Sequence, residues 1–125
     1  MELTARALFE LVPGLARSFP ALDLDRPPWW LAANVDQAIR VLAASGALRH
    51  FRVSSGDVFV HPDAVVETRA IVRGPAVISA GCTVAATAYL RDGVLLGPGT
   101  HVGHAVELKA SIVSGESAIA HLGYV

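Results

Sequence analysis

The second half of the chain repeats a hydrophobic pattern with a period of six residues. From Val60 onward, every sixth residue is aliphatic, and a small or β-branched residue follows four positions later. A period of six fits neither the 3.6-residue period of an α-helix nor the alternation of a simple strand. It indicates an internal hexapeptide repeat folded as a parallel β-helix, with the aliphatic side chains in the core and the small residues at the corners. The aliphatic positions are Val60, Val66, Val72, Ile78, Val84, Leu90, Leu96, Val102 and Leu108.

The repeat loses one residue after Leu108. A further step of six would reach Ser114, whereas a step of five reaches Val113, and steps of six then reach Ile119 and Val125. We infer that one residue is missing from the repeat between Leu108 and Val113. Natural sequences tend to depart from a local rule at functional or strained sites, so this break points to a region of interest.

The first part of the chain has a helical pattern instead. Residues 1–57 hold three glycines, against eight in residues 58–125. Apolar residues at helical spacing predict one helix over residues 4–12. A second helix is expected to begin after an N-cap at Asn34, to end near Gly46, and to bury Ala38, Ile39, Leu42 and Ala43. We expect Trp29 and Trp30, between the two helices, to pack on a neighbouring element rather than to stack on a ligand.

These patterns predict a mainly β protein in two parts. The N-terminal α-helical segment covers residues 1–57, and the β-helix covers residues 58–125 and packs on the helical segment or is capped by it. The chain stops at Val125, an aliphatic core position. Because a solenoid needs a polar terminal cap, we expect the β-helix to be truncated there or to be covered by another chain.

Composition excludes several classes of function. The 125 residues include 10 Lys+Arg and 11 Asp+Glu, for a formal net charge of −1, so we expect no nucleic-acid partner held by bulk charge. The longest uncharged run, residues 74–90, is shorter than the roughly 20 apolar residues of a membrane span, and we expect no membrane association. The N-terminus lacks the basic segment of a signal peptide. A single cysteine, Cys82, fits a reducing cytoplasm.

The repeat resembles that of hexapeptide-repeat proteins, which form a left-handed prism with three hexads per coil. In such a prism, residues 18 positions apart stack about 4.8 Å apart. Arg73, Arg91 and Lys109 are spaced by 18 residues, so they are expected to form one column, and Lys109 is the only lysine of the chain. Because like charges stacked along strands repel each other, this column needs an explanation.

The functional interpretation of the column is an anion site, most simply a phosphate held by Arg91 and Lys109. The alternative is a solvated face on which acidic side chains alternate with the cations. The neighbouring column supplies only Glu107 as an acid, and a surface ion pair between Glu107 and Lys109 would contribute little. We therefore favour the anion site over the solvated face.

Further polar residues are expected at the same edge of the prism. The neighbouring column contains Tyr89, Glu107 and, after the break, Tyr124 one coil above Glu107. His104 and His121 fall at the corner that leads onto this face. Taken singly, each histidine could cap a turn carbonyl and Tyr124 could be a packing aromatic. Their convergence beside the break favours a functional site.

The histidines do not predict a metal centre. His101 and His104 form an H-x₂-H pair, with His121 farther along the chain. This spacing does not match that of the hexapeptide-type carbonic anhydrases, so we expect no zinc or other metal. Cys82 falls at an inward small position, where we expect it to pack in the core.

Three stretches of the β-helix resemble one enzyme family. They read YLRDG at residues 89–93, HVGHAVELK at 101–109 and AHLGY at 120–124. The acetyltransferase domain of bifunctional UDP-N-acetylglucosamine pyrophosphorylase/glucosamine-1-phosphate N-acetyltransferase has the similar patterns L-R-P-G, H-V-G-N-F-V-E-x-K-K and A-G-H-L-T-Y. The resemblance covers about residues 60–125, and the family shares the shortened repeat after its lysine.

The resemblance implies roles for these residues. His121 matches the family's general base, which takes a proton from the sugar amine as the amine attacks acetyl-CoA, and a near-neutral imidazole suits that task. Arg91 and Lys109 match residues that bind the sugar phosphate, and Tyr124 matches a residue that contacts the sugar. Glu107 matches a residue that positions the polar network, and we expect it to be part of the catalytic site together with His121.

The resemblance also sets expectations for substrates and partners. We expect acetyl transfer from acetyl-CoA to an amino-sugar phosphate or sugar nucleotide in a homotrimer, with the acetyl-CoA sites between subunits. We expect His104 to be one of the substrate-binding residues, although the family has Asn at this position. Gly123 replaces a Thr of the family and Ala110 replaces a Lys. These departures leave the identity of the acceptor sugar open. The alternative is a non-catalytic, trimerising or sugar-nucleotide-binding module associated with a nucleotidyltransferase. Residues 1–57 are too short for a nucleotidyltransferase domain.

Overall fold

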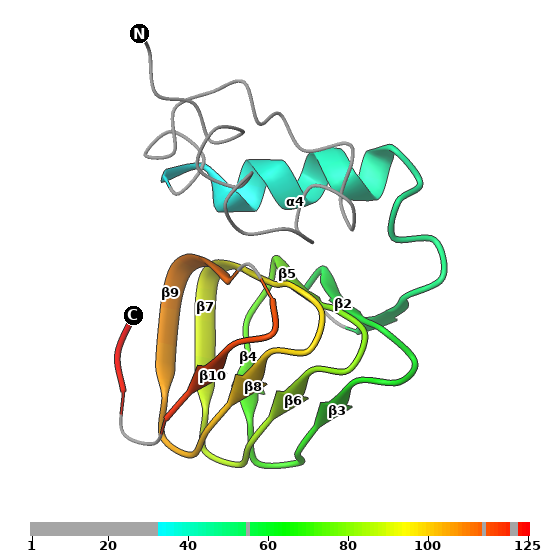
Figure 1. Cartoon of the computed structure of the whole chain (residues 1–125). Helices are drawn as coiled ribbons and strands as arrows, with labels where there is room; N and C mark the ends of the chain where they lie inside the picture. Colours follow the sequence, from blue (N-terminus) through cyan, green and yellow to red (C-terminus); the bar gives the residue numbers. More distant parts are fainter. Residues whose placement is uncertain (1–32, 55, 114, 121–122) are drawn as a thin grey trace, which may run out of the picture.

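The computed structural model describes residues 33–54, 56–113, 115–120 and 123–125. The expected helix over residues 4–12 and the Trp29–Trp30 pair lie outside the described residues. Within the described residues, one α-helix precedes ten strands, nine of which are stacked in parallel as a β-helix (Figure 1). The elements are α4 (Val35–Ala44), β1 (Arg52–Ser54), β2 (Val58–Val60), β3 (Val65–Val66), β4 (Ile71–Val72), β5 (Ala76–Ile78), β6 (Thr83–Val84), β7 (Tyr89–Leu96), β8 (His101–Val102), β9 (Glu107–Val113) and β10 (Ala118–Ile119).

The strands stack in three sets, which form the faces of the β-helix. The helix-covered face contains β2, β5 and the second halves of β7 and β9. The second face contains β3, β6, β8 and β10. The cationic face contains β4, the first halves of β7 and β9, and Tyr124. β7 and β9 are long because each continues around the corner between the cationic and the helix-covered face. The prediction of a parallel β-helix from the six-residue period is confirmed.

The register of the strands confirms the break in the repeat. Leu90 pairs with Leu108, a separation of 18 residues, whereas Leu96 pairs with Val113, a separation of 17. The register shift lies between Arg91 and Val94 on β7. Tyr124 then forms a parallel bridge with Glu107, so it lies one coil above Glu107, as the five-residue step predicts.

The aliphatic positions of the repeat fill a single apolar core. The small corner residues pack in the same core, including Cys82, which is fully buried as expected. The residues in this core are Val58, Val60, Ala64, Ala76, Ile78, Cys82, Val84, Ala88, Leu90, Val94, Leu96, Val102, Val106 and Leu108, with Val66, Val72, Val113 and Ile119 half-buried against it. Buried apolar surface of this kind is the main favourable term in folding.

Helix α4 packs along the side of the β-helix rather than over its end (Figure 1). It lies on an outward column of apolar residues, in which Val77 and Leu95 are fully buried. The helix buries Val35, Ala38, Ile39 and Leu42 against this column, together with Leu48, Phe51, Phe59 and Ile112. Ala43 is exposed, so the expectation that it is buried was wrong, and Val35 takes its place on the buried face.

The ends of α4 follow the sequence signals closely. Asn34 occupies the N-cap position, although its side chain does not make a capping hydrogen bond. Gly46, one residue beyond the C-cap Ser45, has a positive φ of 84°, the left-handed conformation that glycine adopts without strain.

Among the described residues no helix has the length and apolar character of a membrane span. After α4, β1 pairs antiparallel with β2, which covers one edge of the first coil.

Candidate functional site

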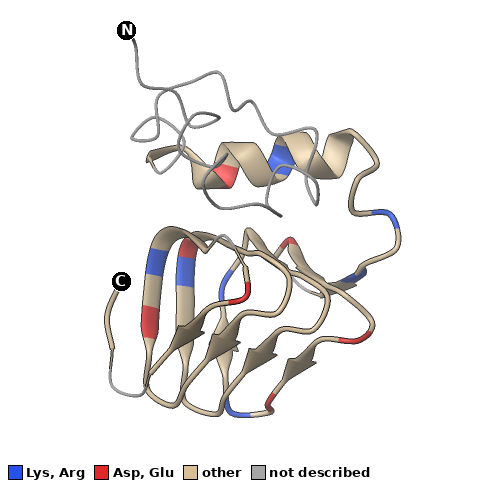
Figure 2. Ribbon diagram, in the orientation of Figure 1, with Lys and Arg blue, Asp and Glu red and all other residues tan. Residues whose placement is uncertain are grey.

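The cationic face carries two columns of outward side chains. Arg73 follows β4, and Arg91 and Lys109 are directly paired neighbours on β7 and β9 (Figure 2). The backbone N–H of Arg73 donates to the carbonyl of Leu90, so Arg73 lies in register one coil below Arg91. The predicted cationic column is therefore present in the fold. The column beside it contains Ile71, Tyr89, Glu107 and Tyr124.

Arg91 is held between two carboxylates. Its Nε donates to Glu107 Oε1 at 2.6 Å, and its Nη1 donates to Asp92 Oδ2 at 3.1 Å. The hydrogen bond to Glu107 raises the pKa of the Arg91 guanidinium, and the Asp92 charge acts in the same direction. Glu107 therefore pairs with Arg91 rather than forming the surface pair with Lys109 that the sequence left open.

The aromatic ring of Tyr89 lies near two arginines. The Cζ atom of Arg73 is 5.8 Å from the centre of the ring, and that of Arg91 is 5.9 Å from it. A guanidinium at this distance from an aromatic face is weakly attracted to it. Both guanidinium groups are therefore positioned beside one ring on the cationic face.

Lys109 and Arg73 have no carboxylate partner among the residues that the structure describes. Both side chains are exposed, and the ion pairs of this face all involve Arg91. The unbalanced positive charge therefore lies at the two ends of the column, while the charge of Arg91 at its centre is compensated. A cation without a carboxylate partner is available to form a charge-assisted hydrogen bond to a bound anion.

Of the remaining site residues, the structure describes Tyr124 and His104. Tyr124 is 65% exposed and stacks in register above Glu107. His104 is exposed at the corner before β9, with its Nδ1 3.0 Å from the carbonyl oxygen of Ala86. His121 lies outside the described residues. The structure thus gathers Arg91, Glu107, Lys109 and Tyr124 on one face, with His104 at the corner leading onto it.

Two contributors to this site were not assigned roles from the sequence. Asp92 follows Arg91 directly and binds it, and the ring of Tyr89, on the same strand, lies beside the Arg91 guanidinium. Asp92 stands where the resembling family has Pro, a departure that the sequence made visible without revealing its effect. His101 lies on the second face, where its Nδ1 is 2.6 Å from Thr83 Oγ1. It is therefore not part of the site on the cationic face.

The break in the repeat connects the site to helix α4. Opposite the shift, Asp92 and Gly93 bulge out of β7 with φ values of 62° and 91°. Gly93 lies against the first turn of α4, where an added Cβ would be 2.8 Å from the backbone N of Asp36. A bulge changes the direction of a strand locally, and here it turns β7 from the cationic face onto the helix-covered face.

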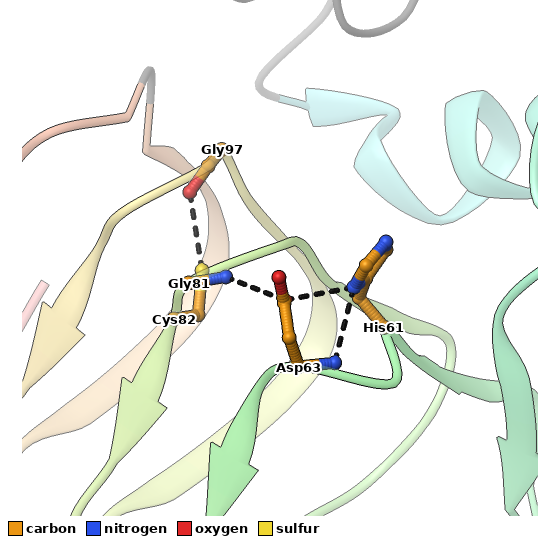
Figure 3. A network of polar contacts seen from close by, with 5 residues as sticks. All are labelled: His61, Asp63, Gly81, Cys82 and Gly97. Atoms are coloured by element: carbon orange, nitrogen blue, oxygen red, sulfur yellow. Dashed lines mark hydrogen bonds and ion pairs between the residues drawn. The ribbon is translucent and has the colours of Figure 1, made fainter.

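A second polar network stabilises a corner of the first coils. Asp63 Oδ1 accepts a hydrogen bond from the backbone N–H of Gly81 at 2.8 Å and lies 2.8 Å from His61 Nδ1 (Figure 3). Nearby, Cys82 Sγ donates to the carbonyl of Gly97, and burial raises the pKa of the Cys82 thiol. These contacts join residues of successive coils and are structural.

The Asp63 contacts predict a specific loss of stability in acid. The hydrogen bond from Gly81, followed by the contact with His61, lowers the pKa of Asp63 below its usual 3.8. A lowered pKa in the folded state stabilises the protein above the unfolded-state value, and this stabilisation disappears as the pH falls through the folded-state value. We expect Asp63→Asn to lower the free energy of unfolding at pH 7, and we expect its deficit to shrink below about pH 4. Urea unfolding between pH 7 and pH 2 measures the difference.

The control for Asp63 is Asp57→Asn. Asp57 is also exposed, and its side chain makes no hydrogen bond within the described part of the chain. If the two variants lose the same stability at pH 7, or if the Asp63→Asn deficit does not change with pH, the assigned role of the carboxylate is wrong.

Two curated proteins with the same name are similar in sequence to this chain. The chain is 37% identical over 78 residues to a protein named Bifunctional protein GlmU from Nitrosomonas europaea, which covers 62% of this chain and 15% of that protein. It is 36% identical over 69 residues to the Bifunctional protein GlmU of Methylococcus capsulatus, which covers 55% of this chain and 15% of that protein. The chain thus aligns with about 15% of the length of these curated relatives.

No protein-family model matches the sequence. No solved structure matches it significantly either. The relationship therefore depends on the two curated relatives and on the hexapeptide β-helix that the structure contains. Together they identify a resemblance to the hexapeptide-repeat acetyltransferase domain, and they support a function related to acetyl transfer.

Proposed function

We propose that this β-helix belongs to an acetyltransferase that transfers an acetyl group from acetyl-CoA to the amine of an amino-sugar phosphate or sugar nucleotide. The observation that carries the proposal is the pair of cations Arg91 and Lys109, stacked beside Glu107 and Tyr124 at the break in the repeat. The resemblance to the curated relatives supports the reaction class. The active unit in this proposal is a homotrimer with acetyl-CoA between subunits.

Each residue has a defined role in this proposal. Lys109 and Arg91 bind the phosphate, with Glu107 and Asp92 orienting the guanidinium of Arg91 through the bonds described above. Tyr124 contacts the sugar from the coil above Glu107, and His104 contributes from the adjoining corner. These groups fix the sugar relative to the base, and such fixed orientation contributes much of the rate enhancement in group-transfer reactions.

His121 acts as the general base in the proposed reaction. As the sugar amine attacks the thioester carbonyl, a C–N bond forms, the C–S bond breaks, and the sulfur departs as the thiolate of coenzyme A. The amine loses a proton in this step, and the imidazole of His121 accepts it. Acid–base catalysis of this kind contributes about 10²–10⁴-fold to the rate.

The decisive experiment measures thiol release from acetyl-CoA in the presence of glucosamine 1-phosphate. We expect His121→Ala to lower kcat by about 10²–10⁴-fold without changing the urea unfolding curve. His50→Ala is the matched control, because His50 is an exposed histidine in the segment between α4 and β1. Thiol release that is unchanged by His121→Ala would refute the role of His121. Sugar-phosphate binding without thiol release would favour the non-catalytic alternative.

Binding of the phosphate is tested separately from turnover. We expect Lys109→Ala to weaken glucosamine 1-phosphate binding by about tenfold, because a charge-assisted hydrogen bond is worth about 1.5–3 kcal/mol. The loss should be larger at low salt, where screening is weaker. Calorimetric titration at two salt concentrations measures it, with Arg69→Ala as the control for net charge. Arg69 is exposed and lies outside the cationic column. Equal losses in the two variants would contradict a phosphate site at Lys109.

A further inference from the structure

We propose that the cationic face binds a ligand with two linked phosphoryl groups, a nucleoside diphosphate sugar, in preference to a sugar monophosphate. Arg73 is the residue that determines this preference. The inference rests on the proposed function, since it uses the same Arg91–Lys109 anion site. It extends the site by one coil to include Arg73, a cation that has no role when a single phosphate binds between Arg91 and Lys109.

The length of the cationic column fits an extended anion. Lys109 pairs with Arg91 across adjacent strands, and Arg73 is in register one coil farther down. At about 4.8 Å per strand, the backbones of Arg73 and Lys109 lie about 10 Å apart. One phosphate between Arg91 and Lys109 leaves Arg73 without an anion. Two linked phosphoryl groups along the column give each exposed end a partner.

The charges on this face favour phosphoryl groups that each carry a single negative charge. Three cations, Arg73, Arg91 and Lys109, face two carboxylates, Asp92 and Glu107, and both carboxylates bind Arg91. Positive charge is therefore available at two separate places, with compensated charge between them. A diphosphate joined to a sugar and a nucleoside has one negative charge on each phosphoryl group, whereas a terminal monophosphate concentrates up to two charges on one group.

Tyr89 keeps Arg73 and Arg91 in a shared orientation. The two Cζ atoms lie 5.8 and 5.9 Å from the centre of the same ring, and the attraction of a guanidinium to an aromatic ring favours both groups staying beside it. A phosphoryl group near the ring edge would accept hydrogen bonds from both guanidinium groups, which carry planar donor sets. With a net charge of +1 on the five ionised groups and −1 on the whole chain, the face does not fit a long polyanion such as a nucleic acid.

The test compares two probes, uridine diphosphate–glucosamine and glucosamine 1-phosphate, by calorimetric titration at one ionic strength. We expect the unmodified chain to bind the diphosphate at least tenfold more tightly. Arg73→Ala should weaken diphosphate binding by about tenfold and monophosphate binding by less than twofold. Because both measurements with the diphosphate include the uridine, its own contribution cancels in the ratio between the unmodified chain and the variant.

Controls separate a local effect of Arg73 from other causes. Arg69→Ala removes the same charge from the same coil outside the column, and we expect it to change diphosphate binding by less than twofold. Arg73→Lys should retain an intermediate affinity, because it keeps the charge and loses the planar donor group. Urea unfolding curves check that each variant folds, and Arg73 is exposed, so its replacement leaves the core intact.

The outcomes distinguish this inference from the proposed function. Equal affinity for the two probes, or equal losses from Arg73→Ala and Arg69→Ala, would overturn the diphosphate preference and leave the phosphate site of Lys109 and Arg91 in place. If Lys109→Ala and Arg91→Ala change the binding of neither probe, the phosphate site itself is wrong and both proposals fail. A selective loss of diphosphate binding in Arg73→Ala supports the inference.

Discussion

Replacing Leu95 with alanine is expected to lower the free energy of unfolding by about 2–5 kcal/mol, the usual cost of emptying a buried leucine site. Leu95 points outward from β7, yet it is fully buried because helix α4 covers it. The variant therefore leaves a cavity between helix and β-helix, lined by Ile39, Leu42 and Val77. Urea unfolding monitored by circular dichroism measures the loss.

Leu95→Met is the matched control, because it keeps the volume and the apolar character of the side chain. Such replacements usually cost less than about 1.5 kcal/mol. On an uncovered face of the β-helix, Leu95→Ala would have almost no effect on the free energy of unfolding. A loss below about 0.5 kcal/mol, as is usual for exposed positions, would therefore show that α4 does not cover Leu95.

Gly93→Ala is the second substitution with a large expected effect. Gly93 has a φ of 91°, and an added Cβ would lie 2.8 Å from the backbone N and 3.2 Å from the Cα of Asp36. The positive φ costs alanine about 1–2 kcal/mol, and the contact with α4 adds an overpacking cost of about 1–3 kcal/mol. We expect the free energy of unfolding to fall by about 2–5 kcal/mol.

Gly46→Ala separates the two causes. Gly46 has a similar φ of 84°, but nothing lies within 4 Å of the position of its added Cβ. It should therefore show the backbone cost alone, about 1–2 kcal/mol. Because Gly93 follows Arg91 and Asp92, Gly93→Ala should also weaken glucosamine 1-phosphate binding, whereas Gly46→Ala should not. Equal effects of the two variants on stability would contradict the close approach of α4 to the bulge.

The sequence predicted the inside of the β-helix better than its outside. A six-residue period separates inward from outward positions, and the inward aliphatic residues, the break after Leu108 and the stacking of Tyr124 above Glu107 all follow from counting. The burial of Phe59, Val77, Leu95 and Ile112 was missed because these residues precede inward positions and therefore point outward. Their recurrence once per coil was the signal that one face is covered.

The site was predicted at the level of columns but not of contacts. Spacing by 18 residues placed Arg73, Arg91 and Lys109 in one column. It did not show that Glu107 and Asp92 both bind Arg91, because the choice of partner depends on side-chain rotamers and on the bulge at Asp92. β1 was also missed, since its three residues, Arg52–Ser54, are exposed and carry no alternating pattern.

The position of α4 has a consequence for how the protein unfolds. In a solenoid each coil contacts only its neighbours, so coils at the ends are free to fray one at a time. Helix α4 contacts β5, β7 and β9, which belong to successive coils. Detaching any one of these coils from the helix therefore uncovers apolar surface that the others share. The helix therefore couples the stability of these coils, and we expect denaturant to unfold them in one cooperative transition rather than in steps.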